Sequence, residues 1–157
     1  MTICNIGNLP GDLKARIPKG QRLLGLDPGT KTIGVALSDV SWMIASPYAT
    51  IARQSWVKDI DALVRIIDKE GVGGVVMGLP VQMDGTEGER AAAARKLAAK
   101  LLERKDLPLI FQDERLSTAA VQRMMVVEMD LSRKKRQAAV DKAAAAYILQ
   151  GALDGMR

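Results

Sequence analysis

The chain has 157 residues, 48% hydrophobic and 26% charged, which fits one globular domain with a single core and excludes a disordered chain. The absence of histidine excludes Ser-His-Asp triads and histidine metal ligands. Catalysis would therefore have to use Asp, Glu, Lys or Tyr side chains, or a metal ion such as Mg²⁺ or Mn²⁺ held by oxygen ligands. The single cysteine, Cys4, excludes an internal disulfide and a cysteine zinc site, and the net charge of +5 favours a polyanionic partner such as nucleic acid.

Residues 1–20 predict a flexible N-terminal extension ahead of a single domain at 21–157, because glycines and prolines recur there among polar residues. The next three apolar segments predict strands at 23–27, 33–37 and 45–51. Bulky and small residues alternate along the second of them, as on a strand with two different faces. Pro28 and Gly29 turn the chain between the first two, and the three strands predict an antiparallel meander.

The segment from Ile60 to Ile67 carries apolar residues at helical spacing and is followed by Gly71, which predicts a helix that ends there. Residues 73–78 (GGVVMG) are short, apolar and flanked by glycine, as a central parallel strand should be. The elements predicted next are a loop at 79–88, an alanine-rich helix from about 89 to 104, and a last strand at 108–112.

Beyond the last strand, Ser117 can cap a further helix, and a final helix is predicted from about Ala138 to Leu153. The element order β-β-β-α-β-α-β-α-α predicts an α/β domain. Its mixed five-stranded sheet, with three antiparallel strands and then parallel strands, would be flanked by helices.

Acidic residues stand at the ends of two predicted strands. Asp27 ends the first strand, and Asp113 and Glu114 follow the last one, at the carboxyl ends where α/β sheets bind ligands. A buried carboxylate costs several kcal/mol unless it is paired, hydrogen-bonded or bound to a metal. Asp141 shares one stripe of the final helix with Ala144, Ala145 and Ile148. Converging carboxylates would suit Mg²⁺ or Mn²⁺ ions that activate water.

Each acid also has a structural interpretation, which the sequence leaves open. Asp27 could initiate the turn at Pro28 and Gly29. Asp113 or Glu114 could pair with Arg115, and Asp141 could be an acid near the N-terminus of its helix, favoured by the helix dipole.

The unbroken basic run Arg133, Lys134, Lys135 and Arg136 precedes the predicted final helix. Four cations near a helix start oppose the helix dipole, so local structure does not account for them. The run could hold phosphates beside Asp141 as a mobile lid, or it could be a solvated loop.

Four segments in order, LGLDPGTKTIGVALSD, VMGLPVQMDGTEGERA, DERLST and VDKAAAAYILQ, resemble the motifs of the YqgF/RuvX family. These are bacterial RNase H-like, Holliday-junction-resolvase-like proteins described as "putative pre-16S rRNA nucleases". The similarity runs from about Arg22 to the C-terminus. It implies an RNase H-like fold, a divalent metal (Mg²⁺ or Mn²⁺), and hydrolysis of RNA phosphodiester bonds during maturation of the 16S rRNA 5′ end.

The resemblance implies that Asp27, Glu114 and Asp141 are the catalytic and metal-binding acids. Related resolvases place an acid after the fourth strand, where this chain has Gly78, Leu79 and Pro80, and the resemblance gives that role to Glu114. Thr32 stands where the family often has a basic residue. The cations expected to bind nucleic acid are Lys31, Arg115, Arg133, Lys134, Lys135 and Arg136.

Three other functions compete with an rRNA nuclease. The DPGT segment also resembles the first phosphate loop of actin-like kinases, but 157 residues cannot supply their second half-domain. A non-catalytic RNA-binding factor and a DNA junction resolvase both stay open, and nothing in the sequence fixes a homodimer interface. Without a membrane span or a secretory signal pattern, we expect a cytoplasmic protein without a membrane partner.

Overall fold

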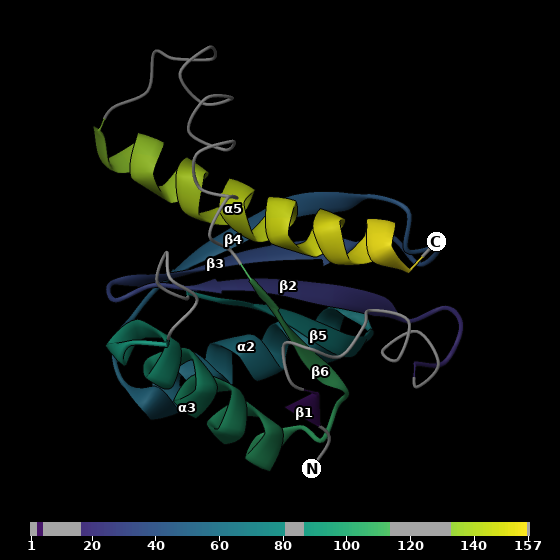
Figure 1. Ribbon diagram of the computed structural model, residues 1–157, viewed down its shortest axis with the longest axis horizontal. Helices are drawn as coiled ribbons and strands as arrows, with labels where there is room; N and C mark the ends of the chain where they lie inside the picture. The colour runs from purple at the N-terminus through teal and green to yellow at the C-terminus, as the bar shows by residue number, and fades with distance from the viewer. Residues whose placement is uncertain (1–2, 5–16, 81–86, 114–132, 157) are drawn as a thin grey trace.

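The computed structural model describes residues 3–4, 17–80, 87–113 and 133–156 (Figure 1). The predicted helix after Ser117 lies outside the described residues, as do Glu114 and Arg115.

One mixed sheet forms the centre of the molecule, with the strand order β1-β6-β5-β2-β3-β4. The central pair β2–β5 is parallel, as are β5–β6 and β1–β6, whereas β2, β3 and β4 form an antiparallel meander. The strands are β1 (Ile3–Cys4), β2 (Arg22–Pro28), β3 (Thr32–Ser38), β4 (Ala45–Ala52), β5 (Val72–Leu79) and β6 (Leu109–Asp113).

The five predicted strands and their directions are confirmed, and β5 is buried along its whole length as a central parallel strand should be. The sixth strand was not expected. Ile3 and Cys4 pair with β6, and Ile17 is buried, so parts of the predicted N-terminal extension belong to the sheet and the core.

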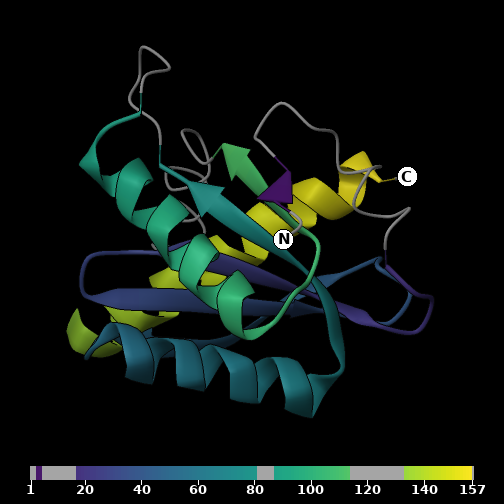
Figure 2. The ribbon, with the colours of Figure 1, turned by 90° about the horizontal axis from the view of Figure 1, so that it is seen from below.

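Helices cover both faces of the sheet (Figures 1 and 2). Helices α2 (Trp56–Glu70) and α3 (Glu89–Arg104) pack on one face against Leu24, Leu26 and Val75. Helix α5 (Arg133–Gly155) packs on the other face against Leu23, Val76 and Ile110. The two faces of β2, β3, β5 and β6 therefore contribute to two separate cores.

The ends of α2 follow ordinary capping chemistry. The Ser55 hydroxyl accepts a hydrogen bond from the backbone N–H of Lys58, and Gly71 adopts the left-handed conformation (φ 65°) that ends the helix. The prediction that Gly71 ends this helix is confirmed.

Helix α5 begins at Arg133, five residues before the predicted start at Ala138. The interpretation of Arg133–Arg136 as a loop or lid before the helix was therefore wrong. Arg, Lys, Gln and Ala are strong helix formers, and an unfavourable charge in the first turn costs only about 0.3 to 1 kcal/mol. Because Asp141 then lies about two turns inside the helix, the helix dipole does not explain it.

Helix α5 approaches the sheet at two glycines. A Cβ atom at Gly25 of β2 would overlap Leu149 and the carbonyl of Ala145. One at Gly34 of β3 would overlap the backbone carbonyl of Asp141. The helix backbone therefore lies directly on the strand backbone at Gly34, where any side chain would push it away.

We expect Gly34→Ala to destabilise the fold by roughly 1 to 3 kcal/mol, because the added methyl group meets backbone atoms that cannot rotate away. Gly151→Ala is the matched control. A Cβ at Gly151 would lie 3.6 Å from Nε2 of Gln112, an ordinary contact, and alanine favours the helix by about 0.5 to 1 kcal/mol. Urea unfolding of both variants measures the difference, and equal effects would contradict the tight α5–β3 contact.

Candidate functional site

The three parallel strands β2, β5 and β6 end together at Pro28, Leu79 and Asp113, and we call this the carboxyl end of the sheet. Helices α2, α3 and α5 all begin there, at the left of both ribbon views (Figures 1 and 2). Ligands of open α/β sheets bind at such ends.

Asp27 faces α5 at the carboxyl end of the sheet. Side chains alternate along a strand, and Leu23 and Gly25 both contact α5 or belong to the core on its side. Asp27 continues this series and is half-buried. The strand therefore directs its carboxylate to the face that α5 covers.

Asp141 of α5 also lies at the carboxyl end of the sheet, beside Asp27. Asp27 pairs in the β2–β3 register with Gly34, the residue on which the Asp141 backbone rests. The Thr32 hydroxyl, also on β3, donates a 2.7 Å hydrogen bond to Oδ2 of Asp141. Cα atoms of paired strand residues lie about 5 Å apart, so two carboxylates 114 positions apart in sequence lie close together.

The neighbouring strands place a glycine and a glutamine in line with Asp27. The register pairs Leu26 with Met77 and Gly78 with Gln112, so Gly78 and Gln112 continue the row of Asp27 across the sheet. Gln112 reaches towards α5, with Nε2 3.6 Å from the place of a Cβ at Gly151. Gly78, between Asp27 and Gln112 in this row, contributes no side chain.

The structure brings together two of the three predicted acids. Glu114 lies outside the described residues, and of Asp113 only the backbone is described, at the end of β6. Within the described ranges, no group of three His, Cys, Asp or Glu side chains is placed to hold a metal ion. The chemistry of the donors that are described, two carboxylates near a hydroxyl, suits a hard cation such as Mg²⁺ or Mn²⁺.

Arg53 braces the turn that follows Asp27. Its Nη1 donates a 3.0 Å hydrogen bond to the carbonyl of Gly29, and its backbone N–H donates a 2.9 Å hydrogen bond to the carbonyl of Lys31. Asp59 is only 3% exposed. Its carboxylate accepts a hydrogen bond from Arg53 Nε at 3.4 Å and another from the backbone N–H of Gln54 at 3.0 Å. This brace links the acidic turn to α2.

Arg95 of α3 contacts both the residue that precedes the helix and the last strand. The Arg95 guanidinium donates two hydrogen bonds to Glu87, at 2.7 and 2.9 Å, and lies over the Phe111 ring. The hydrogen bond from Arg95 lowers the pKa of the Glu87 carboxyl below its usual value. The chain entering α3 is thereby fixed to the last strand.

Sequence reasoning missed Thr32 and Arg53 as parts of the site. In the sequence, Thr32 stands out only as a departure from the family pattern. Its position five residues after Asp27, just beyond the turn at Pro28 and Gly29, is the one feature that could have placed it near the acid. No local sequence pattern indicates Arg53. Its partners are the carbonyl of Gly29, in the turn between β2 and β3, and the carboxylate of Asp59 in α2.

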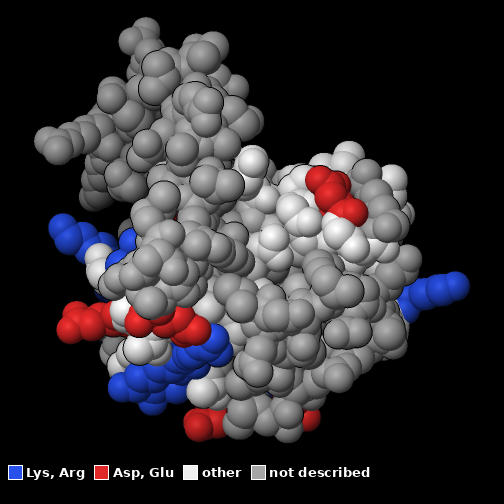
Figure 3. All heavy atoms as spheres, viewed as in Figure 1, with Lys and Arg blue, Asp and Glu red and all other residues white. Residues whose placement is uncertain are grey.

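The structure describes the predicted phosphate-binding cations to different extents. Lys31 is exposed in the turn after Asp27. The backbone of Arg133–Arg136 forms the start of α5 at the carboxyl end of the sheet. On the face shown in the space-filling view, basic and acidic side chains lie together at the lower left, where α3 begins (Figure 3).

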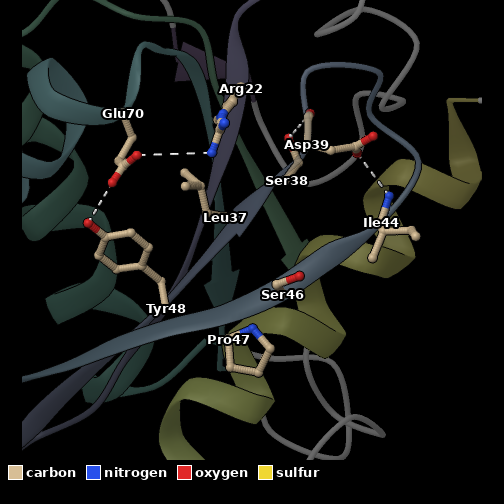
Figure 4. Close-up of a pocket in the computed structure, with 9 residues that line it drawn as sticks. All are labelled: Arg22, Leu37, Ser38, Asp39, Ile44, Ser46, Pro47, Tyr48 and Glu70. Carbon is tan, nitrogen blue, oxygen red and sulfur yellow. Dashed lines mark hydrogen bonds and ion pairs between the residues drawn. The ribbon is translucent and has the colours of Figure 1, made fainter.

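A pocket of about 570 Å³ lies at the opposite end of the sheet (Figure 4). Tyr48 donates a 2.8 Å hydrogen bond to Glu70 there, and Arg22 lies 4.0 Å from the same carboxylate. The hydrogen bond to Glu70 raises the pKa of Tyr48. The pocket contains neither Asp27 nor Asp141, so it is separate from the acidic site.

Within the described residues, no helix combines the length and apolar character that crossing a bilayer requires.

The sequence matches the model of the RuvX family, described as "Holliday junction resolvase", over residues 21–155. It is 55% identical to a "Putative pre-16S rRNA nuclease" of Paramagnetospirillum magneticum over 92% of this chain and 93% of that protein. It is 49% identical to a protein of the same description from Rhodospirillum rubrum, over 99% of this chain and 94% of that one.

Among solved structures, the chain resembles "T. thermophilus RuvC in complex with Holliday junction substrate", with a TM-score of 0.54 and 13% identity. The match covers 82% of this chain and 91% of that one. A second structure of the Thermus thermophilus protein matches with a TM-score of 0.53 and 10% identity, over 82% and 92% of the two chains. At such identities the likeness concerns the fold, and it confirms the predicted RNase H-like architecture.

We expect Thr32→Val to destabilise the fold by about 1 to 2 kcal/mol, because it removes the hydrogen bond that Asp141 accepts and keeps the side-chain shape. Thr30→Val is the control, since Thr30 is exposed in the same turn. Urea unfolding of both variants tests the effect. Equal stability of the two would contradict the role of Thr32 in holding the Asp141 carboxylate.

Proposed function

The chain belongs to the RuvX family of Holliday-junction-resolvase-like nucleases, and we propose that it is a metal-dependent nuclease that processes the 5′ end of pre-16S rRNA in the cytoplasm. The observation that carries this proposal is the meeting of Asp27 and Asp141 at the carboxyl end of the sheet. The names of the relatives support RNA as the substrate.

Asp27 and Asp141, together with Glu114, would hold Mg²⁺ or Mn²⁺. When bound, such an ion supplies an activated water and stabilises the leaving oxygen of the phosphodiester. Thr32 fixes the orientation of one carboxylate, and Arg53 holds the turn that carries the other. In the absence of metal, the two neighbouring negative charges repel each other and destabilise the site.

The substrate strand would be held by cations around these acids. Lys31 lies in the turn beside Asp27, and Arg133, Lys134, Lys135 and Arg136 begin α5 at the carboxyl end of the sheet. Arg115 follows Glu114 directly in the sequence. Phosphate contacts of this kind position a strand without reading its sequence. The start of a helix concentrates the four cations on about one turn.

A DNA junction resolvase is the second candidate function, and the description of the family favours it. The chemistry at the acids would be the same, and only the substrate differs. A resolvase cuts a two-fold symmetric junction and would need a homodimer, so the two functions differ in substrate and in oligomeric state.

The deciding experiment compares wild type and Asp27→Asn on pre-16S rRNA, a Holliday junction and plain duplexes, with and without Mn²⁺. We expect wild type with Mn²⁺ to cleave the rRNA precursor and the variant to cleave nothing. Mn²⁺ should raise the melting temperature of wild type only, because binding to the folded state stabilises it. Without metal, the variant should melt at the same or a higher temperature.

Normal cleavage by Asp27→Asn would contradict the metal-site assignment. Cleavage of the junction but not of the precursor would make the protein a DNA resolvase. Nucleic-acid binding by wild type without cleavage of any substrate would favour the RNA-binding factor.

The third acid can be assigned by a pair of variants. Gln112 reaches towards α5, and the two-residue period of a strand predicts that position 114, rather than 113, shares its face. Glu114→Gln should therefore abolish cleavage and weaken the Mn²⁺-dependent rise in melting temperature. Asp113→Asn should keep both, with at most a loss of stability. The reverse pattern would assign the role to Asp113.

A further inference from the structure

A cluster of cations surrounds Trp56, the first residue of α2. The Arg53 guanidinium lies 4.9 Å from the centroid of the Trp56 ring, and the Nζ atoms of Lys96 and Lys100 lie at 5.2 and 5.5 Å. All three distances are within the roughly 6 Å range of cation–π attraction. We call these four residues the Trp56 cluster.

The two lysines of the Trp56 cluster differ from three other cations in or next to α3. Arg95, Arg104 and Lys105 each have a carboxylate partner within hydrogen-bond distance. Lys96 and Lys100 have no ion pair in the part of the chain that the structure describes. They stand one helical turn apart on α3, where like charges repel each other. The indole ring holds both ammonium groups in place but does not neutralise them.

The Trp56 cluster is joined to the acidic site by one side chain. Arg53 contacts the Trp56 ring and also donates to the carbonyl of Gly29, two residues after Asp27. The cluster lies on the α2–α3 side of the sheet, whereas Asp141 lies on the α5 side. Helix α2 begins with Trp56, and this helix starts at the carboxyl end of the sheet (Figure 2). The Trp56 cluster and Asp27 therefore belong to the same end of the sheet.

We propose that Lys96 and Lys100, held by Trp56, bind backbone phosphates of the nucleic-acid strand that is cut at Asp27 and Asp141. This inference rests on the proposed nuclease function and adds a binding surface on the α2–α3 side. Exposed Lys96 and half-buried Lys100 provide the charge. Trp56 limits the freedom of both side chains, which lowers the entropy lost when a phosphate binds.

The test measures binding separately from cleavage. Labelled single-stranded RNA and DNA of one sequence are titrated with protein in EDTA across a salt series. The Lys96→Gln/Lys100→Gln variant should bind both strands more weakly than wild type. The slope of log K against log salt should become less steep by about 0.7 for each lost phosphate contact.

The matched control is Lys19→Gln/Lys69→Gln, which removes the same charge from exposed lysines that precede β2 and β5 at the opposite end of the sheet. Its slope should equal that of wild type. An unchanged slope in the Lys96/Lys100 variant, or an equal change in the control, would overturn the inference.

The outcomes also separate this inference from the function on which it rests. If wild type binds no nucleic acid and cleaves none with Mn²⁺, the proposed function fails as well. If wild type cleaves while the Lys96/Lys100 variant keeps the wild-type slope, only the phosphate surface is wrong.

Substitutions of Trp56 test the part played by the ring. Trp56→Leu should weaken binding of both strands, and Trp56→Phe should restore most of it, because phenylalanine keeps an aromatic face. Equal affinities of the leucine variant and wild type would show that the ring does not hold the lysines for phosphate. Urea unfolding of each variant confirms that the protein is folded in the binding assay.

Discussion

The contact of α5 with Gly34 is the constraint on which the acidic site depends. Because Gly34 has no side chain, the backbone of α5 rests directly on β3, and Asp141 comes level with Asp27 on the adjacent strand. Gly25 allows the same close approach one strand away, against Ala145 and Leu149. The alanines of α5 fit this arrangement, since small side chains on the helix complete a backbone-to-backbone interface.

Side chains from neighbouring elements hold the two acidic positions in place. Thr32 donates to Asp141 from the strand on which α5 rests. On the other side, Arg53 fixes the turn after Asp27 and is itself held by the buried carboxylate of Asp59. The Asp141 carboxylate and the turn after Asp27 are therefore each held by a contact from a neighbouring element.

The two ends of the sheet have different character. At the carboxyl end, helices α2, α3 and α5 begin and Asp27 meets Asp141, with the Trp56 cluster on the α2–α3 side. At the opposite end, Arg22, Tyr48 and Glu70 form a closed set of polar contacts around the pocket. The two acids, Asp27 and Asp141, and the pocket therefore lie at opposite ends of the same sheet.

The sequence alone determined five of the six strands, the helix that ends at Gly71 and the stripe of Asp141 on α5. Each of these depends on short-range periodicity or on one capping residue, whereas β1 has only two residues and forms through its pairing with β6. The sequence also placed Asp27 at a strand end and identified the family from four motifs. The sequence left the start of α5 open, because the helix dipole disfavours four cations there while their helix propensity favours a helix, and the structure shows that α5 begins at Arg133. The tertiary structure alone brought Thr32 to Asp141, Arg53 to Gly29 and two lysines to Trp56. These contacts join elements that are distant in sequence or cross a turn, and only packing of the whole chain brings them together.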